Sequence, residues 1–391
     1  MSILSVSKKL SSSNQIVISL DPEICLHSRD RFATCEACFD ICPEKAIEPG
    51  KPPALNEANC KSCLACLPVC PVDAFQGKDA VSSTLKCAPR LQGKKVDILC
   101  ERHPNPSLGL DKTHTGLKIR GCLAGLGVGA LVEFALCGLN EVTLRLDACQ
   151  DCIWGNFQKL ILTQYKTAEE LLNALNIKQN IQYVEVLDVE MERPFWQTES
   201  PPLSRRDLFK VTTNQGRVSL GKILDDGLDK NQKQIGRNNY RLSRIGDYVS
   251  EAASVNKSLP SGLPLASVTV WESCIACGAC ARICPTEALY FLENKKEKTF
   301  DLLFTAPFCV GCEACVHICP TDAIEVNHHP SVDEIFNANV PSSLVSGTLQ
   351  VCEKCRAFFA GKPEEELCPI CIARKQNPFG PRSDRCSGPQ S

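Results

Sequence analysis

Short apolar runs alternate with helical stretches in the middle of the chain. The runs are VDILC, LKIRGC, EVTLRLDAC and IQYVEVLD, and each is rich in branched aliphatic residues. Between them, apolar residues recur at helical spacing in LVEFALCGL and TAEELLNALN. Strands that alternate with helices usually form a parallel sheet covered by those helices. We therefore expect a small parallel α/β domain over residues 85–195.

The pattern turns polar after this domain. Residues 196–265 contain the turn-forming combinations SPP, DDG, GRNN and SLPSGLP. This composition predicts a loosely structured linker that is able to wrap a neighbouring part of the protein. Basic residues outnumber acidic ones between Ser204 and Arg244. A solvated linker face explains this excess more simply than a docking site for an acidic partner does.

Residues 204–210 read SRRDLFK and resemble a twin-arginine export motif. The segment is internal, and no apolar run follows it, so we do not expect it to direct export. Ser204 and Asp207 have the spacing of a capping box, which predicts the start of a helix.

Neither of the two candidate apolar stretches predicts a membrane segment. The opening MSILSVSKKLSSSNQ has too short an apolar run for a signal peptide, and CLAGLGVGALVEFALCGL is interrupted by Glu133. The formal net charge of -2, with basic and acidic residues mixed, gives no reason to expect a nucleic-acid partner.

One short pattern occurs four times outside the middle domain. The copies read CPEKAI at 42–47, CPVDAF at 70–75, CPTEAL at 284–289 and CPTDAI at 319–324. They form two pairs, one on each side of the middle domain, so we expect two related modules. The chain has 391 residues, which is enough for two or three domains.

Cysteine is unusually abundant, with 27 residues, while aromatic residues make up only 6%. Most of the cysteines are separated by two or three residues, whereas a disulfide framework disperses them. Close grouping favours metal binding, and soft thiolates select zinc and iron–sulfur clusters. Such sites need reduced thiols, so we expect a cytoplasmic protein, from an anaerobic environment.

The stretch CVGCEACVHICP at 309–320 shows the chemistry of the repeats. Three cysteines at C-x2-C-x2-C spacing let one loop supply three ligands of a cubane, and the cysteine before proline supplies a ligand to the other cluster. Small residues between the ligands, such as Gly278 and Gly311, allow a close approach of the backbone to the cluster. Neither zinc binding nor simple packing explains why the cysteine–proline pair is repeated.

On these motifs the sequence resembles the bacterial two-[4Fe-4S] ferredoxin family, over about 25–75 and about 268–327. The resemblance implies four [4Fe-4S] clusters in two modules, at 15–80 and 266–330. In the second module it implies one cluster on Cys274, Cys277, Cys280 and Cys319, and another on Cys309, Cys312, Cys315 and Cys284. In the first module it implies one cluster on Cys60, Cys63, Cys66 and Cys42, and another on Cys25, Cys35, Cys38 and Cys70.

The last of these sets departs from the family pattern. Nine residues separate Cys25 from Cys35, where the family usually has two. An inserted loop explains this if its ends stay close together. The alternative is a labile cluster that lacks one ligand.

Four further cysteines follow predicted strands of the middle domain. Carboxyl ends of parallel strands lie at one edge of a sheet, so these thiols are expected to converge. The region resembles the iron–sulfur delta subunit of methyl-viologen-reducing hydrogenase, a family also fused to heterodisulfide reductase components, in VDILC, IRGCLAGLGVGALVEFALCGLNEV and DACQDC. The resemblance implies a [2Fe-2S] cluster on Cys100, Cys122, Cys149 and Cys152. The alternative is a packed domain whose cysteines are small apolar side chains; Cys87 and Cys137 are interpreted in that way.

The tail over 345–391 contains two C-x2-C pairs in CEKCRAFFAGKPEEELCPIC. This spacing predicts a zinc-ribbon-like structural site on Cys352, Cys355, Cys368 and Cys371, with a fifth cubane as the rival occupant. Cys386 is expected to be free. The predicted fold class is therefore α+β and multidomain, with two ferredoxin-like modules flanking a small parallel α/β domain and a zinc-ribbon-like tail.

Cubanes with four cysteine ligands have no free corner for a substrate, so they transfer electrons. The sequence has no dinucleotide-binding or P-loop motif, and we expect no catalytic side chain. We expect an electron-transfer subunit that connects a redox enzyme, such as a hydrogenase, a formate dehydrogenase or a heterodisulfide reductase-like protein, to another carrier. The alternatives are a redox enzyme subunit with an open-site cluster and a redox-sensing or assembly protein.

Overall fold

The computed structural model describes residues 18–187, 191–202, 236–247, 257–337, 341–361 and 364–376. Residues 204–210 and Cys386, for which the sequence makes predictions, lie outside these ranges. The chain divides into two compact units. Unit 1 comprises residues 1–25, 36–253 and 260–263, and unit 2 comprises residues 26–35, 254–259 and 264–391. Both mix helices with strands.

The region predicted to form the first ferredoxin-like module opens unit 1. Its strands are two residues long and pair antiparallel: β1 (Ser19–Leu20) with β4 (Phe75–Gln76), and β2 (Ile47–Glu48) with β3 (Ala54–Leu55). The helices α3 (Ala37–Ile41) and α4 (Cys66–Val69) each end at a cysteine that precedes proline. Elements this short carry little stability of their own, so the fold of the module depends on what its cysteines bind.

A five-stranded sheet forms the centre of the middle domain. Its order is β11-β7-β5-β8-β9, and every neighbouring pair is parallel. The strands are β5 (Lys95–Leu99), β7 (His114–Lys118), β8 (Glu141–Arg145), β9 (Ile181–Val184) and β11 (Phe195–Gln197). β5, β8 and β9 fall on the predicted runs, whereas β7 begins before its run, LKIRGC, and shares only Leu117 and Lys118 with it. β11 extends the sheet into the stretch predicted to be linker.

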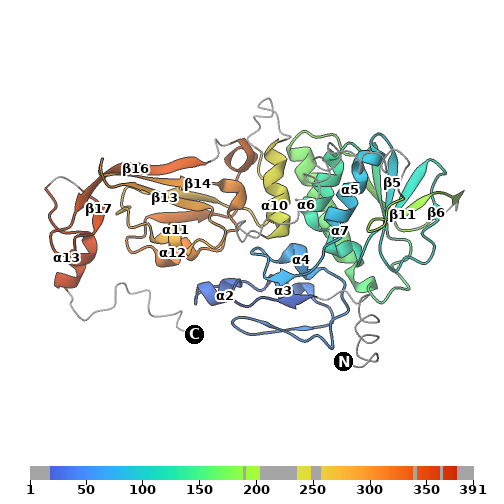
Figure 1. Ribbon diagram of the computed structural model, residues 1–391, viewed down its shortest axis with the longest axis horizontal. Coiled ribbons are helices and arrows are strands. Elements are labelled where there is room, and N and C mark those ends of the chain that lie inside the picture. Colours follow the sequence, from blue (N-terminus) through green and yellow to red (C-terminus); the bar gives the residue numbers. More distant parts are fainter. Residues whose placement is uncertain are drawn as a thin grey trace, which may run out of the picture. The chain divides into compact units, whose positions relative to one another are not determined.

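Helices cover this sheet as the alternating pattern predicts. α6 (Gly127–Leu136) and α7 (Gln158–Ala174) pack against each other beside the sheet, and α5 (Val81–Leu91) leads into β5 (Figure 1). α6 is apolar nearly all round and is buried from Gly127 to Phe134, because neighbouring helices cover the side that the sheet does not. A small antiparallel pair, β6 (Leu108–Gly109) with β10 (Met191–Glu192), completes the domain.

The basic stretch predicted to be a solvated linker instead includes a packed helix. α10 (Arg237–Ser243) contacts α4 and α6, and the side chains of Arg237 and Arg241 are buried. Arg237 Nε donates to Asp73 Oδ1 at 2.8 Å, and Arg241 Nη2 donates to Asp79 Oδ2 at 2.6 Å. The expectation of a solvated face is therefore wrong for these two arginines. Their carboxylate partners lie more than a hundred residues away in sequence, where local composition gives no sign of them.

Unit 2 is built around the second module. β12 (Ser267–Val270) pairs antiparallel with β15 (Ile324–Asn327), and the short helices α11 (Ala279–Ile283) and α12 (Ala314–Ile318) pack against each other (Figure 1). A second sheet has the order β13-β14-β16-β17. Its strands are β13 (Leu289–Asn294), β14 (Thr299–Phe304), β16 (Ser342–Val351) and β17 (Phe358–Ala360).

The tail continues from this sheet. β16 pairs with β14 of the module at one end and with β17 of the tail at the other, so one long strand belongs to both. Helix α13 (Pro369–Gln376) ends the described part of the tail. Phe300, Leu349 and Ala276 form a shared apolar core between module and tail.

The insertion between Cys25 and Cys35 is also ordered. It contains the short helix α2 (Leu26–Arg29), and His27 Nε2 lies 2.8 Å from the Cys35 carbonyl oxygen. Asp30 Oδ2 lies 2.7 Å from Nδ1 of His317, a residue of α12 in the same unit. The insertion is thus a structured loop with its own contacts.

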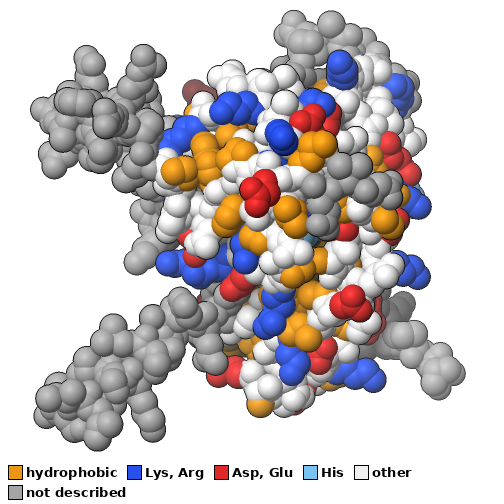
Figure 2. Space-filling model, turned by 90° about the vertical axis from the view of Figure 1, so that its right-hand side faces the viewer, with side chains coloured by type: hydrophobic (Ala, Val, Ile, Leu, Met, Phe, Trp, Pro, Cys, Tyr) orange, Lys and Arg blue, Asp and Glu red, His pale blue; other side chains and the backbone are white. Residues whose placement is uncertain are grey.

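Within the described ranges, no helix is long and apolar enough to cross a membrane. The face seen in Figure 2 carries lysine and arginine side chains interspersed with aspartate and glutamate. The mixture agrees with the absence of a strong charge bias in the sequence.

We predict that Arg241→Leu destabilises unit 1. The change leaves Asp79 buried without its closest partner, and breaking a buried ion pair from one side costs about 3–5 kcal/mol. Arg244→Leu is the matched control, because its side chain is 37% exposed and partly exposed pairs contribute about 1 kcal/mol or less. Thermal unfolding of anaerobically purified protein measures both; equal melting temperatures for the two variants would contradict the prediction.

Candidate metal centres

The second module places its eight cysteines around two cavities. One cavity is lined by Cys274, Cys277, Cys280 and Cys319. The other is lined by Cys284, Cys309, Cys312 and Cys315. Each cavity thus combines three cysteines of one motif with the cysteine that precedes proline in the other motif. This is the exchange of ligands that the resemblance implies.

A repeated backbone conformation makes these ligand loops. Two residues between the three cysteines have positive φ: Ala276 and Gly278 in one motif, Gly311 and Glu313 in the next. Alternating left-handed residues curl a loop so that successive amides point inward, which forms an anion-binding concavity. A cubane with four thiolates is an anionic group, so the loops suit it.

A left-handed residue also follows each cysteine–proline pair. Lys45, Asp73, Glu287 and Asp322 occupy this position in the four repeats, with φ between 48° and 56°. The turn brings a later amide back to the sulfur, as in the bonds from Ala74 N to Cys70 Sγ at 3.2 Å and from Ala323 N to Cys319 Sγ at 3.3 Å. Such N–H···S bonds stabilise a thiolate and tune a cluster's potential.

Burial makes these sulfurs poor thiolates without a cation. It raises the pKa of Cys280 and Cys309 to about 12 and that of Cys312 to about 11, with neighbouring cysteines adding to the effect. A bound metal offsets this cost, because the ligand is then deprotonated outright.

In the first module one set of four matches this geometry. Cys60, Cys63 and Cys66 surround left-handed Ser62 and Leu64. Burial raises the pKa of Cys66, and the nearby sulfurs of Cys63, Cys60 and Cys42 raise it further. The structure therefore brings together the set Cys42, Cys60, Cys63 and Cys66.

The set of Cys25, Cys35, Cys38 and Cys70 has a different loop. Glu36, between Cys35 and Cys38, has φ of -118°, so the left-handed step of the other three motifs is absent there. Cys70 is buried and accepts the Ala74 amide. Ligation of a cluster by this set stays a prediction.

The middle cysteines lie beyond the carboxyl ends of the strands, as predicted. Cys100 follows β5, Cys122 follows β7, and Cys149 and Cys152 follow β8. After the effect of burial, Cys100 and Cys152 are the largest contributors to the raised pKa of Cys149, which is about 12. Burial likewise raises the pKa of Cys122, with Cys100 and Cys149 contributing. All four sulfurs therefore interact at one edge of the sheet.

Polar contacts hold the three loops of this site together. Gly121 N donates to Glu101 Oε2 at 2.9 Å, and Glu101 N donates to the Gly121 carbonyl at 3.0 Å. His103 Nε2 lies 3.2 Å from Asp147 Oδ2, and Arg145 binds both oxygens of that carboxylate at 2.6 and 2.8 Å. Four thiolates held in this way are a donor set that iron–sulfur clusters and zinc both use. Sequence reasoning missed Glu101, His103 and Asp147, because their partners lie in other loops.

The remaining described cysteines of this domain have packing roles. Cys87 is fully buried within α5, where its thiol lies 3.4 Å from the Ser83 carbonyl oxygen. Cys137 immediately follows α6 and donates to the Phe134 carbonyl oxygen at 3.1 Å. Both agree with a structural interpretation.

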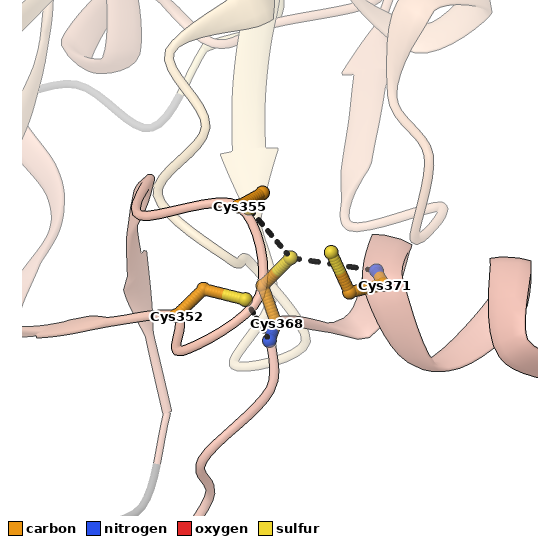
Figure 3. A group of neighbouring side chains, drawn as sticks. All are labelled: Cys352, Cys355, Cys368 and Cys371. Carbon is orange, nitrogen blue, oxygen red and sulfur yellow. Dashed lines mark hydrogen bonds between the residues drawn. The ribbon is translucent and has the colours of Figure 1, made fainter.

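The tail cysteines form the tightest group. The sulfurs of Cys352, Cys355, Cys368 and Cys371 all lie within 4.8 Å of one another, and Figure 3 shows the side chains gathered at one point. Cys355 Sγ lies 3.8 Å from Cys368 Sγ. A Zn–S bond of about 2.3 Å in tetrahedral geometry sets neighbouring sulfurs about 3.8 Å apart. A cubane needs a wider opening, so this geometry favours a single metal ion.

Backbone donors prepare the same site for a cation. The Cys368 amide donates to Cys352 Sγ at 3.3 Å, and this bond is the main reason that the pKa of Cys352 is lowered to about 6. Cys371 N donates to Cys368 Sγ at 3.4 Å. Amides directed at sulfurs in this way are typical of closed structural zinc sites.

Comparison with known families supports the second module. Residues 273–326 match the 4Fe-4S dicluster domain, a range that contains all eight cysteines of the two cavities. No curated protein gives a significant match to the chain. The match shows a ferredoxin-like 4Fe-4S domain in this part of the chain, and iron–sulfur binding with it.

We predict that Gly278→Val removes one cluster of the second module. Gly278 has φ of +65°, and a Cβ there would lie 3.0 Å from Arg282 Nη1 and 3.1 Å from Phe291 Cδ1. Iron content should fall by about four atoms per chain. Gly93→Val is the control, since Gly93 has φ of +74° but open space around it. Equal iron contents in the two variants would count against the assigned ligand loop.

We predict that Cys355→Ser lowers zinc by about one atom per chain and leaves iron unchanged, because a structural zinc site needs four ligands. Metal analysis of anaerobically purified protein measures both elements. Cys137→Ser serves as the control, because Cys137 belongs to none of the proposed sites. Loss of about four irons on replacing Cys355 would instead assign a cubane to the tail.

Proposed function

We propose that this chain is an electron-transfer iron–sulfur subunit with four [4Fe-4S] clusters. The observation that carries the proposal is the pair of cavities in the second module, each lined by four cysteines from two exchanged motifs. The match of this region to the 4Fe-4S dicluster domain supports it. The loop of Cys60, Cys63 and Cys66 in the first module repeats the same left-handed conformations at Ser62 and Leu64, which extends the proposal to its cluster. The fourth cluster, on Cys25, Cys35, Cys38 and Cys70, is proposed from the sequence motif.

The donor sets favour electron transfer over substrate chemistry. Four cysteines occupy the four corners of a cubane, so no iron is left open to a substrate. The bound clusters supply one-electron redox chemistry. The protein's own residues position the thiolates, donate N–H···S bonds to them and exclude water through burial. We therefore assign no catalytic residue to this chain.

We further propose a [2Fe-2S] cluster on Cys100, Cys122, Cys149 and Cys152, and zinc on the four tail cysteines. The mutual influence of the four middle sulfurs supports the first assignment. The 3.8 Å sulfur separation supports the second. Zinc with four thiolates has no open position, so its role is structural. It braces the tail against the second module, where Ala360 N donates to the Ile275 carbonyl at 3.0 Å, inside a ligand loop.

Electron carriers of this kind work between other redox proteins. We propose a partner that is itself a redox enzyme, such as a hydrogenase, a formate dehydrogenase or a heterodisulfide reductase-like protein, in a reducing cytoplasm. The mixed surface charge offers no support for nucleic acid as a partner. The support for the enzyme partner is the number of cysteine-rich centres in one chain, because a series of carriers serves to connect two distant reactions.

We predict about eighteen irons and one zinc per chain after anaerobic purification, together with a matching amount of acid-labile sulfide. EPR spectra of the reduced protein should show reducible clusters. A count of about sixteen irons would exclude a cluster in the middle domain and leave the assignment of clusters to the two ferredoxin-like modules unchanged. About eight irons or fewer in folded protein would overturn the assignment of clusters to both modules.

A further inference from the structure

A single backbone hydrogen bond joins two of the proposed centres in unit 1. The Cys122 amide donates to the Cys63 carbonyl oxygen at 3.2 Å. Cys63 belongs to the cubane set of the first module, and Cys122 belongs to the set of the middle domain. The route from one centre to the other therefore contains only two ligand residues and the hydrogen bond between them.

The packing around this bond is close, and the residues that form it are buried. The side chain of Leu64, which is 1% exposed, lies against two glycines of the middle domain. A Cβ on Gly121 would lie 2.7 Å from Leu64 Cδ1, and a Cβ on Gly125 would lie 2.9 Å from Leu64 Cβ. Only glycine at these two positions allows the two ligand loops to approach so closely.

Further contacts keep the two loops in this position. Pro68 of α4 lies against Gly127, where a Cβ would be 2.6 Å from Pro68 Cβ. Asn238 of α10 accepts a hydrogen bond from Gly129 N at 2.7 Å. The same helix binds Asp73 and Asp79 of the first module through its arginines. The contact is thus held from two sides.

We propose that the middle centre exchanges electrons directly with the cubane on Cys42, Cys60, Cys63 and Cys66 across the Cys63–Cys122 contact. The inference rests on the proposed function and specifies one connection within it. One electron leaves the reduced cubane and enters the oxidised middle centre, so each centre changes by one unit of charge. No covalent bond forms or breaks, and the exchange runs in either direction according to the two potentials.

The proposal assigns distinct roles to the residues of the contact. Cys63 and Cys122 carry the bridge, while Leu64, Gly121 and Gly125 are positioning residues that set the separation. The middle domain is then an internal electron carrier, in contrast to a module that serves only to dock a partner.

The test is EPR spectroscopy of the whole chain, reduced with dithionite under anaerobic conditions. Unpaired electrons on two neighbouring reduced clusters split and broaden each other's signals. We expect such an interaction in the unaltered protein and its loss in Cys149→Ser/Cys152→Ser, which removes the middle centre. The cubane signals should remain in that variant, with narrower lines.

Variants of the contact residues show whether the interaction depends on the distance between the two clusters or only on both clusters being present. Gly125→Ala places a Cβ 2.9 Å from Leu64 Cβ, so it should push the Leu64 loop away and weaken the interaction without loss of iron. The double variant Leu64→Gly/Gly125→Ala removes the Leu64 side chain that the added Cβ would contact, so it should restore the interaction between the two signals. Its remaining close approaches, at 3.3 Å to the Leu64 carbonyl carbon and oxygen, need only a small adjustment.

The outcomes distinguish this inference from the proposed function. Full iron content and reducible clusters whose spectra simply add would overturn the direct exchange and leave electron transfer intact. A chain with about sixteen irons would also overturn it, since the middle centre would hold no cluster. Clusters that cannot be reduced would overturn both.

Discussion

Burial of many thiols close together is the constraint on which the rest of this structure depends. Burial raises the pKa of the thiols of Cys66, Cys122, Cys280 and Cys309, and neighbouring sulfurs raise it further. As thiolates, such groups are stable only when a cation is bound among them, so metal binding and folding are coupled. The ferredoxin-like modules have strands of two to six residues and helices of four or five, too little regular structure to fold by itself.

This constraint explains why left-handed backbone recurs at the same positions. A non-glycine residue in that conformation costs about 1 kcal/mol or more, yet Ser62, Leu64, Ala276 and Glu313 all adopt it. The conformation directs amides into the loop, where they serve the cluster. The strain is confined to one residue, whereas the loop shape that it produces positions all the ligands of the set.

The sequence predicts those parts of the fold that follow a local rule. The strands β5, β7, β8 and β9 follow runs of apolar residues, and the convergence of Cys100, Cys122 and Cys149 follows from the geometry of a parallel sheet. The partners of buried charges follow no local rule. Arg237 and Arg241 look like linker residues in the sequence, and only the folded chain brings Asp73 and Asp79 beside them. His103 and Asp147 likewise meet only in the folded chain. The contact between Cys63 and Cys122 is likewise a product of tertiary packing.

Both ferredoxin-like modules receive a backbone hydrogen bond from an accessory domain inside a ligand loop. In the first module the donor is Cys122 of the middle domain, and in the second it is Ala360 of the tail. The two cases differ in what lies behind the donor. Ala360 lies on β17, near the four thiols for which we propose zinc, a redox-inactive ion, so on this proposal the contact only supports its loop. Cys122 belongs to the four thiols for which we propose a [2Fe-2S] cluster, so on that proposal the same kind of hydrogen bond both supports the loop and connects two centres. A backbone contact at a ligand loop thus takes its function from the chemistry of the donor's own domain.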